Sequence, residues 1–267
     1  MRREIQILDQ AVLPMDYENY VFDLYGTLVD IHTEESQPLV WDKLCLFYGY
    51  YGAFYTPEEM QKSYRALITR EESQMKQNLV NKEAVSNKKI IRYAHESFPE
   101  LEITDVFQAL YAQKGVEADR ALAIHSGQFF RALATEYVKL YEGSRKMLQE
   151  LKDAGKRIYL LSNAQRIFTA YEMNALGITR YFDEIMISSD YGTKKPDKRF
   201  FDLLTEKCHL DISKSLYIGN DSRCDVGGAR QIGMDTFYIC SNISPENDAA
   251  PDATYQVRKF KKWGQTQ

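Results

Sequence analysis

An aspartate that follows a short apolar run is the first sign of chemistry in this sequence. In the segment YVFDLYGTLVD, Asp23 comes directly after Phe22 and shortly before the Gly26-Thr27 pair. Apolar runs of this length, rich in β-branched and aromatic residues, are typical of buried parallel strands. Ligands bind at the carboxyl ends of strands in open α/β sheets, so the pattern predicts a functional carboxylate at Asp23. An aspartate that merely begins a turn would give the same local pattern.

Two further strand-like stretches end in side chains of complementary chemistry. RIYLLSN ends in Ser162 and Asn163, whose hydroxyl and amide groups can hydrogen-bond an anionic oxygen. GTKKPDKRFF places Lys195 directly before Pro196 and a predicted helix. An ammonium group near Asp23 would keep that carboxylate ionised and neutralise charge on a reacting group.

A fourth stretch, IGNDSRCDVGGA, places Asp221 and Asp225 after a strand and at the start of a helix. Acidic residues there also stabilise a helix N-terminus, which is the simpler structural explanation. If they face Asp23, the clustered carboxylates would suit a hard cation such as Mg²⁺. The order of the four stretches favours a shared functional site.

The elements around these stretches change character along the chain. Residues 16–30 are typical of a strand and turn, and the next hundred residues have apolar side chains at steps of three and four, which predicts helices. The predicted helical segments are SQPLVWDKLCLFYGYYG, PEEMQKSYRALITREESQMKQ, NKKIIRYAHESF, ITDVFQALYAQKG and RALAIHSGQFFRALATEYVKLY. After Tyr141, helices and strands alternate. This pattern predicts an α/β fold with a doubly wound parallel sheet and an inserted all-helical domain.

Composition narrows the class of protein. Hydrophobic residues make up 44% of the 267 residues and charged residues 27%, as in folded globular proteins. A net charge of −4 gives no field that attracts nucleic acid or an anionic membrane. Scattered cysteines argue against a zinc site or a disulfide framework. With no membrane span or signal segment apparent, we expect a cytoplasmic protein.

Taken together, the four stretches resemble the motifs of the haloacid dehalogenase-like superfamily. Its members carry a nucleophilic aspartate in DxxGT, a Ser or Thr, a Lys and a terminal acidic pair, here Asp23, Ser162, Lys195, Asp221 and Asp225. The resemblance implies a Rossmann-like core domain in residues 1–32 and 139–267. Residues 33–138 would then form a helical cap that excludes water and contacts the substrate.

The resemblance also implies a role for each matching residue. Asp23 would be the nucleophile, with Tyr25, Ser162 and Lys195 as the other catalytic residues. The substrate would contact Asn163 and the backbone amides of the Gly26-Thr27 turn. The implied Mg²⁺ ligands are Asp23, the Tyr25 carbonyl, Asp221 and Asp225, although Asp225 has a second possible role in binding Lys195 or a metal-coordinated water.

One position departs from the phosphatase pattern. Phosphatases of this superfamily usually have a second aspartate, a general acid and base, two residues after the nucleophile, where this chain has Tyr25. Loss of such a group costs on the order of 10²–10⁴ in rate. Tyrosine there is similar to the 2-haloacid dehalogenases, whose aspartate attacks carbon while halide leaves as an anion. A Mg²⁺-binding protein of this fold without catalysis is a third possibility.

Two observations favour the phosphatase. The dehalogenases usually have a tyrosine six residues beyond the lysine, where this chain has Phe201. They also work without metal, and the charge of Asp221 beside Asp23 would be costly unless a cation offsets it. The sequence therefore predicts a Mg²⁺-dependent hydrolase that cleaves a small phosphorylated metabolite through an aspartyl-phosphate on Asp23.

Overall fold

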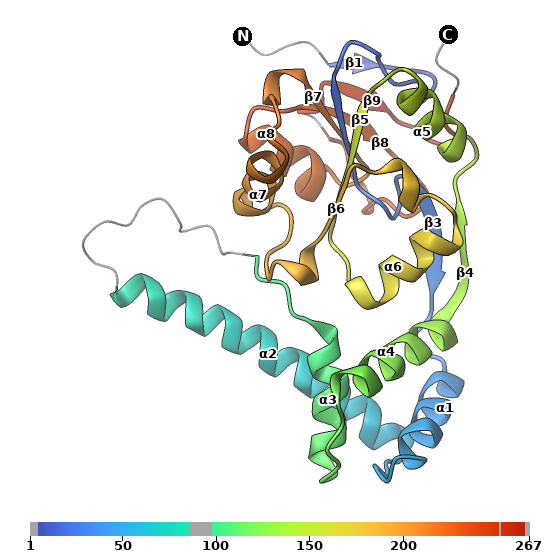
Figure 1. The fold of residues 1–267 in the computed structure, drawn as a ribbon, viewed down its shortest axis with the longest axis vertical. Helices are drawn as coiled ribbons and strands as arrows, with labels where there is room; N and C mark the ends of the chain where they lie inside the picture. The colour runs from blue at the N-terminus through green and yellow to red at the C-terminus, as the bar shows by residue number, and fades with distance from the viewer. Residues whose placement is uncertain (1–4, 86–97, 251, 265–267) are drawn as a thin grey trace.

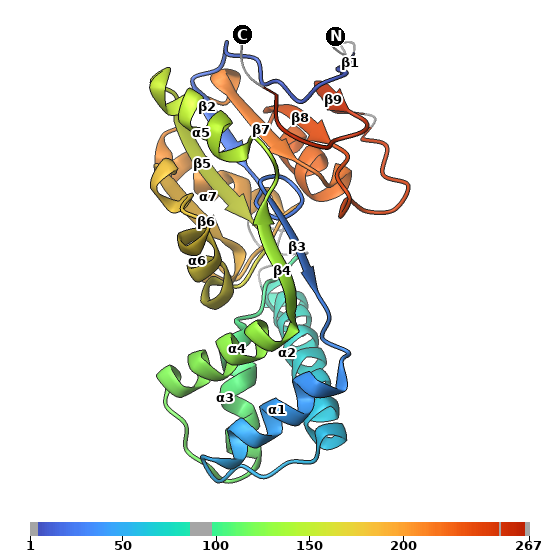
Figure 2. The same ribbon diagram turned by 90° about the vertical axis from the view of Figure 1, so that its right-hand side faces the viewer.

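The structure is a computed structural model that describes residues 5–85, 98–250 and 252–264. An α/β core domain carries both ends of the chain, and the described helices of the insert form a separate cap beside it (Figure 1). Figure 2 shows two long strands, β3 and β4, running side by side between the two parts. The predicted α/β fold with a helical insert is therefore confirmed.

Seven parallel strands form the core sheet. They lie in the order β1-β9-β8-β7-β2-β5-β6. Their bounds are Gln6–Ile7 (β1), Asn19–Phe22 (β2), Arg157–Ser162 (β5), Glu184–Ile187 (β6), Ser215–Gly219 (β7), Asp235–Ile239 (β8) and Tyr255–Val257 (β9). In the sheet, β5 and β6 lie on one side of β2, and β7 and β8 lie on the other. A point where the strand order reverses in this way is where ligands bind in doubly wound sheets, and it lies at Asp23.

Alternation along the strands buries both faces of the sheet. Tyr20 and Phe22 of β2 point to the face covered by α5 and α6, whereas Val21 points to the face covered by α7 and α8. The helix bounds are Ser144–Asp153 (α5), Arg166–Ala175 (α6), Lys198–Cys208 (α7) and Gly228–Gln231 (α8). The buried faces leave only the strand ends free to carry polar chemistry.

The cap is a bundle with its own hydrophobic core. Its helices are Pro38–Gly49 (α1), Pro57–Val85 (α2), Ile103–Gln113 (α3) and Arg120–Ala134 (α4). The rings of Trp41, Tyr64, Phe107 and Phe130 pack together at its centre, with centroids 5.3–5.7 Å apart. Helix α4 begins where the Asp119 carboxylate accepts a hydrogen bond from a first-turn amide.

The end of the insert differs from the sequence prediction. A helix was predicted to run on to Tyr141, but α4 ends at Ala134 and Thr135–Leu140 forms β4. This strand pairs antiparallel with β3, Val29–Thr33. Pairing with β3, which is distant in sequence, overrides the helical pattern there, and β-branched and aromatic residues in TEYVKL suit a strand. The predicted domain boundaries at 32/33 and 138/139 fall inside these two connecting strands.

Two other differences are local, and one predicted helix cannot be compared. The helix predicted after Asp225 is a π-helical turn, Ser222–Gly227, followed by the single turn of α8. Strands β1 and β9 were not predicted. The predicted helix NKKIIRYAHESF lies almost entirely outside the described residues.

The C-terminal aromatics pack against the core domain. Phe260 and Trp263 are buried, and the Trp263 indole donates a hydrogen bond to the Thr27 carbonyl at 3.1 Å. The end of the described chain therefore supports the turn that follows Asp23. Among the described helices, none combines the length and apolar character needed to cross a membrane.

Candidate active site

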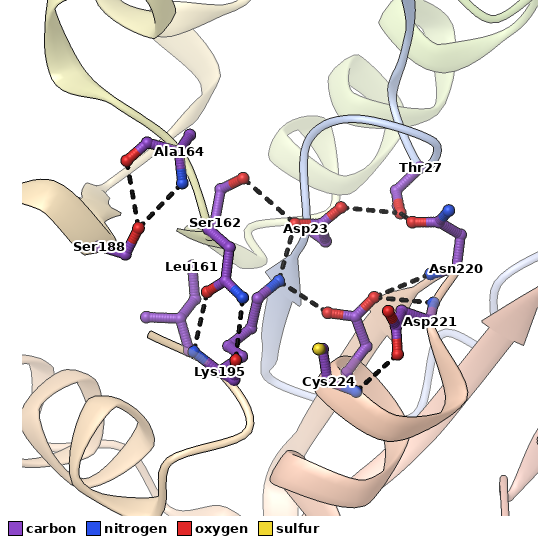
Figure 3. Close-up of polar contacts among 12 residues, drawn as sticks. Asp23, Thr27, Leu161, Ser162, Ala164, Ser188, Lys195, Asn220, Asp221 and Cys224 are labelled. Atoms are coloured by element: carbon purple, nitrogen blue, oxygen red, sulfur yellow. Dashed lines mark hydrogen bonds and ion pairs between the residues drawn. The ribbon is translucent and has the colours of Figure 1, made fainter. Parts of the chain in front are cut away.

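Asp23 lies where the sequence predicts, at the carboxyl end of β2. Its amide donates to the Ile218 carbonyl at 2.9 Å, which extends the β2–β7 pairing by one residue and fixes the backbone of Asp23. The residue is 7% exposed. Figure 3 shows Ser162 and Lys195 pointing at this carboxylate from two other segments.

One oxygen of Asp23 is held and the other is nearly free. Ser162 Oγ donates to Oδ1 at 3.1 Å, and Lys195 Nζ donates to the same oxygen at 2.7 Å. Among the described residues, the hydrogen bond recorded for Oδ2 is a long one, 3.5 Å from Thr27 Oγ1. The carboxylate is therefore oriented through one oxygen while the other stays available for reaction.

Lys195 joins two buried carboxylates. Its Nζ lies 2.7 Å from Asp23 Oδ1 and 2.7 Å from Asp225 Oδ1, and all three side chains are almost fully buried. Burial alone would lower the pKa of Lys195, but the charges of Asp225 and Asp23 outweigh burial and raise that pKa. Lys195 therefore carries a fixed positive charge at the site.

The pKa of Asp23 is raised, whereas an ordinary ion pair lowers the pKa of a carboxyl group. The pKa of Asp23 is raised to about 6 as the net effect of burial, which raises it most, of Lys195, which lowers it, and of the charge of Asp225, which raises it. A further positive charge next to Asp23 would favour the ionised form. The site is therefore short of cationic charge for its two carboxylates.

Asn163 holds the Lys195 backbone. Its Oδ1 accepts from the Lys195 amide at 2.8 Å, and its Nδ2 donates to the Lys195 carbonyl at 2.9 Å. The predicted role for Asn163 was a contact with substrate. In the structure this side chain ties the loop after β6 to the end of β5.

Asp225 and Asp221 play different parts. Asp225 Oδ1 accepts from Lys195, and Oδ2 accepts from the amides of Asn220 and Asp221, each at 3.0 Å. Both of its oxygens are therefore in use, and binding Lys195 was one of its two predicted roles. Asp221 Oδ1 caps the π-helical turn by accepting from the amides of Arg223 and Cys224.

The Gly26-Thr27 turn uses its own amides. Gly26 donates to the Val29 carbonyl at 2.8 Å, and Thr27 donates to the Leu24 carbonyl at 3.3 Å. These amides close the turn, and a contact between them and substrate oxygens stays a prediction. Gly26 itself is required: its φ is +83°, and a Cβ would lie 2.2 Å from Asn220 Nδ2.

Tyr25 does not direct its hydroxyl at the nucleophile. The hydroxyl donates to Glu172 Oε2 and lies 3.2 Å from Thr169 Oγ1, both on α6. Burial, and then the charge of Glu172, raise the pKa of Tyr25 far above that of a free phenol. The side chain is therefore a neutral donor held by α6.

Sequence reasoning missed Tyr217. Its hydroxyl accepts from Lys195 Nζ at 2.8 Å, donates to the Leu161 carbonyl at 3.0 Å, and lies 3.1 Å from Asp225 Oδ1. Within SLYIGND this residue has the pattern of an ordinary buried strand residue. The sequence feature that could have identified Tyr217 is a tyrosine, with its polar hydroxyl, on the strand that leads to Asp221.

The described residues contain no group of three or more His, Cys, Asp or Glu side chains arranged to hold a metal ion. A site built from two carboxylates and a backbone carbonyl would not form such a group. Asp23, the Tyr25 carbonyl and Asp221 are the candidate ligands of that kind, since Asp225 is already engaged.

Comparisons with known proteins agree with this arrangement. A family model described as haloacid dehalogenase-like hydrolase matches residues 17–233. Among curated proteins, the chain is 26% identical over 131 residues to ribulose-1,5-bisphosphate 5-phosphatase from Halopiger xanaduensis, covering 49% of this chain and 54% of that protein. It is 27% identical over 129 residues to glyceraldehyde 3-phosphate phosphatase from Pyrococcus abyssi, covering 48% and 51%. The chain thus spans about half the length of these relatives.

A solved structure has the same fold. The 2-haloacid dehalogenase from Pseudomonas syringae pv. Tomato DC3000 superposes with a TM-score of 0.55 at 18% identity, over 90% of this chain and 94% of that one. Its identity is too low to carry more than the fold. The family match covers most of the chain and includes Asp23, Ser162, Lys195 and Asp225. The chain belongs to the haloacid dehalogenase-like hydrolases.

Proposed function

We propose that the protein is a phosphatase-type hydrolase that removes the phosphoryl group from a small phosphorylated metabolite. The observation that carries this proposal is the state of Asp23: Oδ1 is held by Ser162 and Lys195, and Oδ2 makes only a long contact. A carboxylate oriented in this way is suited to nucleophilic attack. The names of the curated relatives support phosphorus rather than carbon as the atom attacked.

The chain's own residues would act as follows. Asp23 Oδ2 attacks phosphorus in line, the bond to the leaving oxygen breaks, and an aspartyl-phosphate forms; the leaving oxygen takes a proton from solvent, and the water that later attacks returns one to it. Lys195 and Ser162 hold negative oxygens of the phosphoryl group and stabilise the charge that develops. Water then attacks the phosphorus, releases inorganic phosphate and restores the carboxylate. Asn163 and Asp225 keep Lys195 in place throughout.

A Mg²⁺ ion would be held by Asp23, Asp221 and the Tyr25 carbonyl, since each of these carboxylates has one oxygen, Oδ1, that accepts the short hydrogen bonds described above. Asp23 and Asp221 supply carboxylate oxygens and Tyr25 a carbonyl, and Mg²⁺ is commonly held by one or two carboxylates together with substrate phosphate. Lys195 supplies one positive charge to two buried carboxylates, Asp23 and Asp225, so a second positive charge is needed to balance them. When bound, the ion would supply that charge and neutralise the substrate phosphate.

A second candidate is a 2-haloacid dehalogenase-type reaction, in which Asp23 attacks carbon. The specific observation that favours it is the Tyr25 hydroxyl, which is bound to Glu172 and has a raised pKa. No acidic group therefore replaces the usual proton donor at that position. Halide leaves without a proton, so this reaction needs no such donor.

One assay separates these functions. Purified protein is incubated with p-nitrophenyl phosphate, with a panel of small phosphate esters and with 2-chloropropionate, each with Mg²⁺ or with EDTA. We expect phosphate release that requires Mg²⁺ and is abolished by Asp23→Asn. Halide release that resists EDTA would transfer the assignment to the dehalogenase. Absence of both products, with Mg²⁺ binding retained, would indicate a non-catalytic protein.

A further inference from the structure

Glu172 is a buried carboxylate outside the proposed chemistry. It lies on core helix α6 and is 5% exposed. From the cap, Arg131 Nε on helix α4 donates to Oε1 at 2.7 Å and a second guanidinium nitrogen donates to Oε2 at 3.4 Å. Two nitrogens on one carboxylate make a directional link between cap and core.

The same carboxylate also binds the loop after the nucleophile. Tyr25, two residues beyond Asp23, donates its hydroxyl to Glu172 Oε2. The guanidinium carbon of Arg131 lies 5.8 Å from the centroid of the Tyr25 ring. The cap, helix α6 and the loop that carries Asp23 therefore meet at one buried acidic group.

Apolar packing and polar contacts together hold this junction. Ile167 of α6 packs into the hydrophobic core of the cap. A cavity of about 560 Å³ lies next to this packing, between α4, β4 and α6, and Arg131 and Glu172 are among the residues that line it. Loss of the Arg131 contact would leave Glu172 buried without its cation, which is costly for an ionised carboxylate.

A second polar contact holds the start of α6 against the cap. Gln165 Oε1 accepts from the Ile103 amide at 2.9 Å, and its Nε2 donates to the Leu101 carbonyl at 2.9 Å. These uncharged bonds lie at the other end of the cap–core contact. Among the described residues, the ion pair recorded between α4 and α6 is Arg131–Glu172.

We propose that Arg131, Glu172 and Tyr25 form a cap latch, in which Glu172 is the positioning residue. The latch holds α4 against the core and keeps the Tyr25 hydroxyl directed at Glu172. Movement of the cap and orientation of the side chain next to the nucleophile are thereby coupled. The inference rests on the proposed function only in treating Asp23 as the reacting group. The latch itself concerns the position of the cap, which does not depend on the reaction.

The test measures cap position without any activity. Hydrogen–deuterium exchange of the connecting strands, Val29–Thr33 and Thr135–Leu140, is followed by mass spectrometry in the full-length protein. Arg131→Gln should accelerate exchange there by about tenfold or more, because the buried charge of Glu172 then opposes the docked cap. Arg131→Lys, which keeps the charge but loses the two-nitrogen geometry, should give an intermediate rate.

The control is Arg166→Gln, on α6, the helix that also carries Glu172. Arg166 donates through two nitrogens to Asp190, but both residues lie in the core. We expect exchange of the connecting strands to stay at the wild-type rate. Equal acceleration by Arg131→Gln and Arg166→Gln would overturn the proposal.

A double variant that removes the charges of both Arg131 and Glu172 tests the proposal independently. In Arg131→Gln/Glu172→Gln no charge is left buried and unpaired, so exchange should return to within about threefold of the wild-type rate. A double variant that exchanges as fast as Arg131→Gln would exclude Glu172 as the coupling group. Because exchange needs no substrate, failure of the phosphatase assay would leave this result interpretable.

Discussion

The hydroxyl of Tyr217 lies 2.8 Å from the ammonium nitrogen of Lys195. The Tyr217 ring packs against Phe201, with centroids 5.5 Å apart. Phe201 is the position at which related dehalogenases usually have a tyrosine. Phe201 has no hydroxyl, and in this chain the hydroxyl that contacts Lys195 comes from Tyr217 on β7.

Tyr217→Phe should reduce the rate more than a remote variant of the same kind. Loss of the hydroxyl removes one partner of Lys195 and leaves the Leu161 carbonyl without its donor. We expect a loss of about 1–2 kcal/mol in the free energy of unfolding. Since Asp23 and Asp225 still hold Lys195, the fall in kcat should be only about tenfold.

Tyr48→Phe in the cap is the matched control. Its hydroxyl is also buried and donates to a backbone carbonyl, that of Phe107, at 2.8 Å. Urea unfolding should show a similar loss of stability and the rate assay no change. Equal rates in the two variants would deny Tyr217 any part in positioning Lys195.

Lys195→Met should be the most damaging of the site substitutions. It leaves Asp23 and Asp225 buried beside each other without their shared cation. Breaking a buried ion pair on one side costs about 3–5 kcal/mol of stability. Loss of one group that stabilises the transition state lowers kcat by on the order of 10²–10³.

Lys198→Met provides the comparison for Lys195. Its ammonium group pairs with Asp202 one helical turn away, and both side chains are partly exposed. The free energy of unfolding should change by less than about 1 kcal/mol, with unchanged turnover. Similar unfolding midpoints for the two lysine variants would contradict the buried network described for Lys195.

Gly26→Ala should disturb the turn that aims Asp23. The new Cβ would meet Asn220 Nδ2 at 2.2 Å, and the residue would keep a φ of +83°. We expect stability to fall by about 2–4 kcal/mol, from the strain of a positive φ together with the clash. The nucleophile would shift with the turn, so turnover should fall at least about a hundredfold.

Gly52→Ala separates the strain from the clash. Gly52 has a similar φ of +87°, but the nearest atom to its Cβ would be Val116 Cγ2 at 3.9 Å. Thermal unfolding should show a loss of about 1 kcal/mol, with normal activity. If Gly26→Ala were no worse than Gly52→Ala, the close approach of Asn220 would have no energetic effect.

The raised pKa of Asp23 predicts a pH-dependent difference in stability between wild type and Asp23→Asn. The carboxyl binds its proton more tightly in the folded chain, with a pKa of about 6 against 3.8 for the free group. This contribution to stability is complete below pH 3.8 and is lost as the pH rises through 6. In EDTA, wild type should therefore lose on the order of 2 kcal/mol relative to Asp23→Asn between pH 4 and pH 7.

Urea unfolding of both proteins at several pH values measures this difference. A difference that grows in favour of wild type with rising pH would mean that Lys195 dominates over burial at Asp23. Adding Mg²⁺ at pH 7 should stabilise wild type more than Asp23→Asn if Asp23 is one of the proposed ligands.

The sequence by itself determined the frame of the site. Apolar runs that end in Asp23, Ser162 and Asp221 predicted three strands whose carboxyl ends meet, because strand periodicity and turn residues are local signals. Helical periodicity likewise predicted the cap.

Only the tertiary structure decided which groups serve which partner. Tyr217 has the period of a core strand, and its hydroxyl gains meaning only when Lys195 arrives from the loop after β6. Glu172 and Arg131 are distant in sequence and meet through the docking of α4 on α6. Hydrogen bonds and buried charges depend on distances of a few ångströms between segments, and local sequence patterns do not encode such distances.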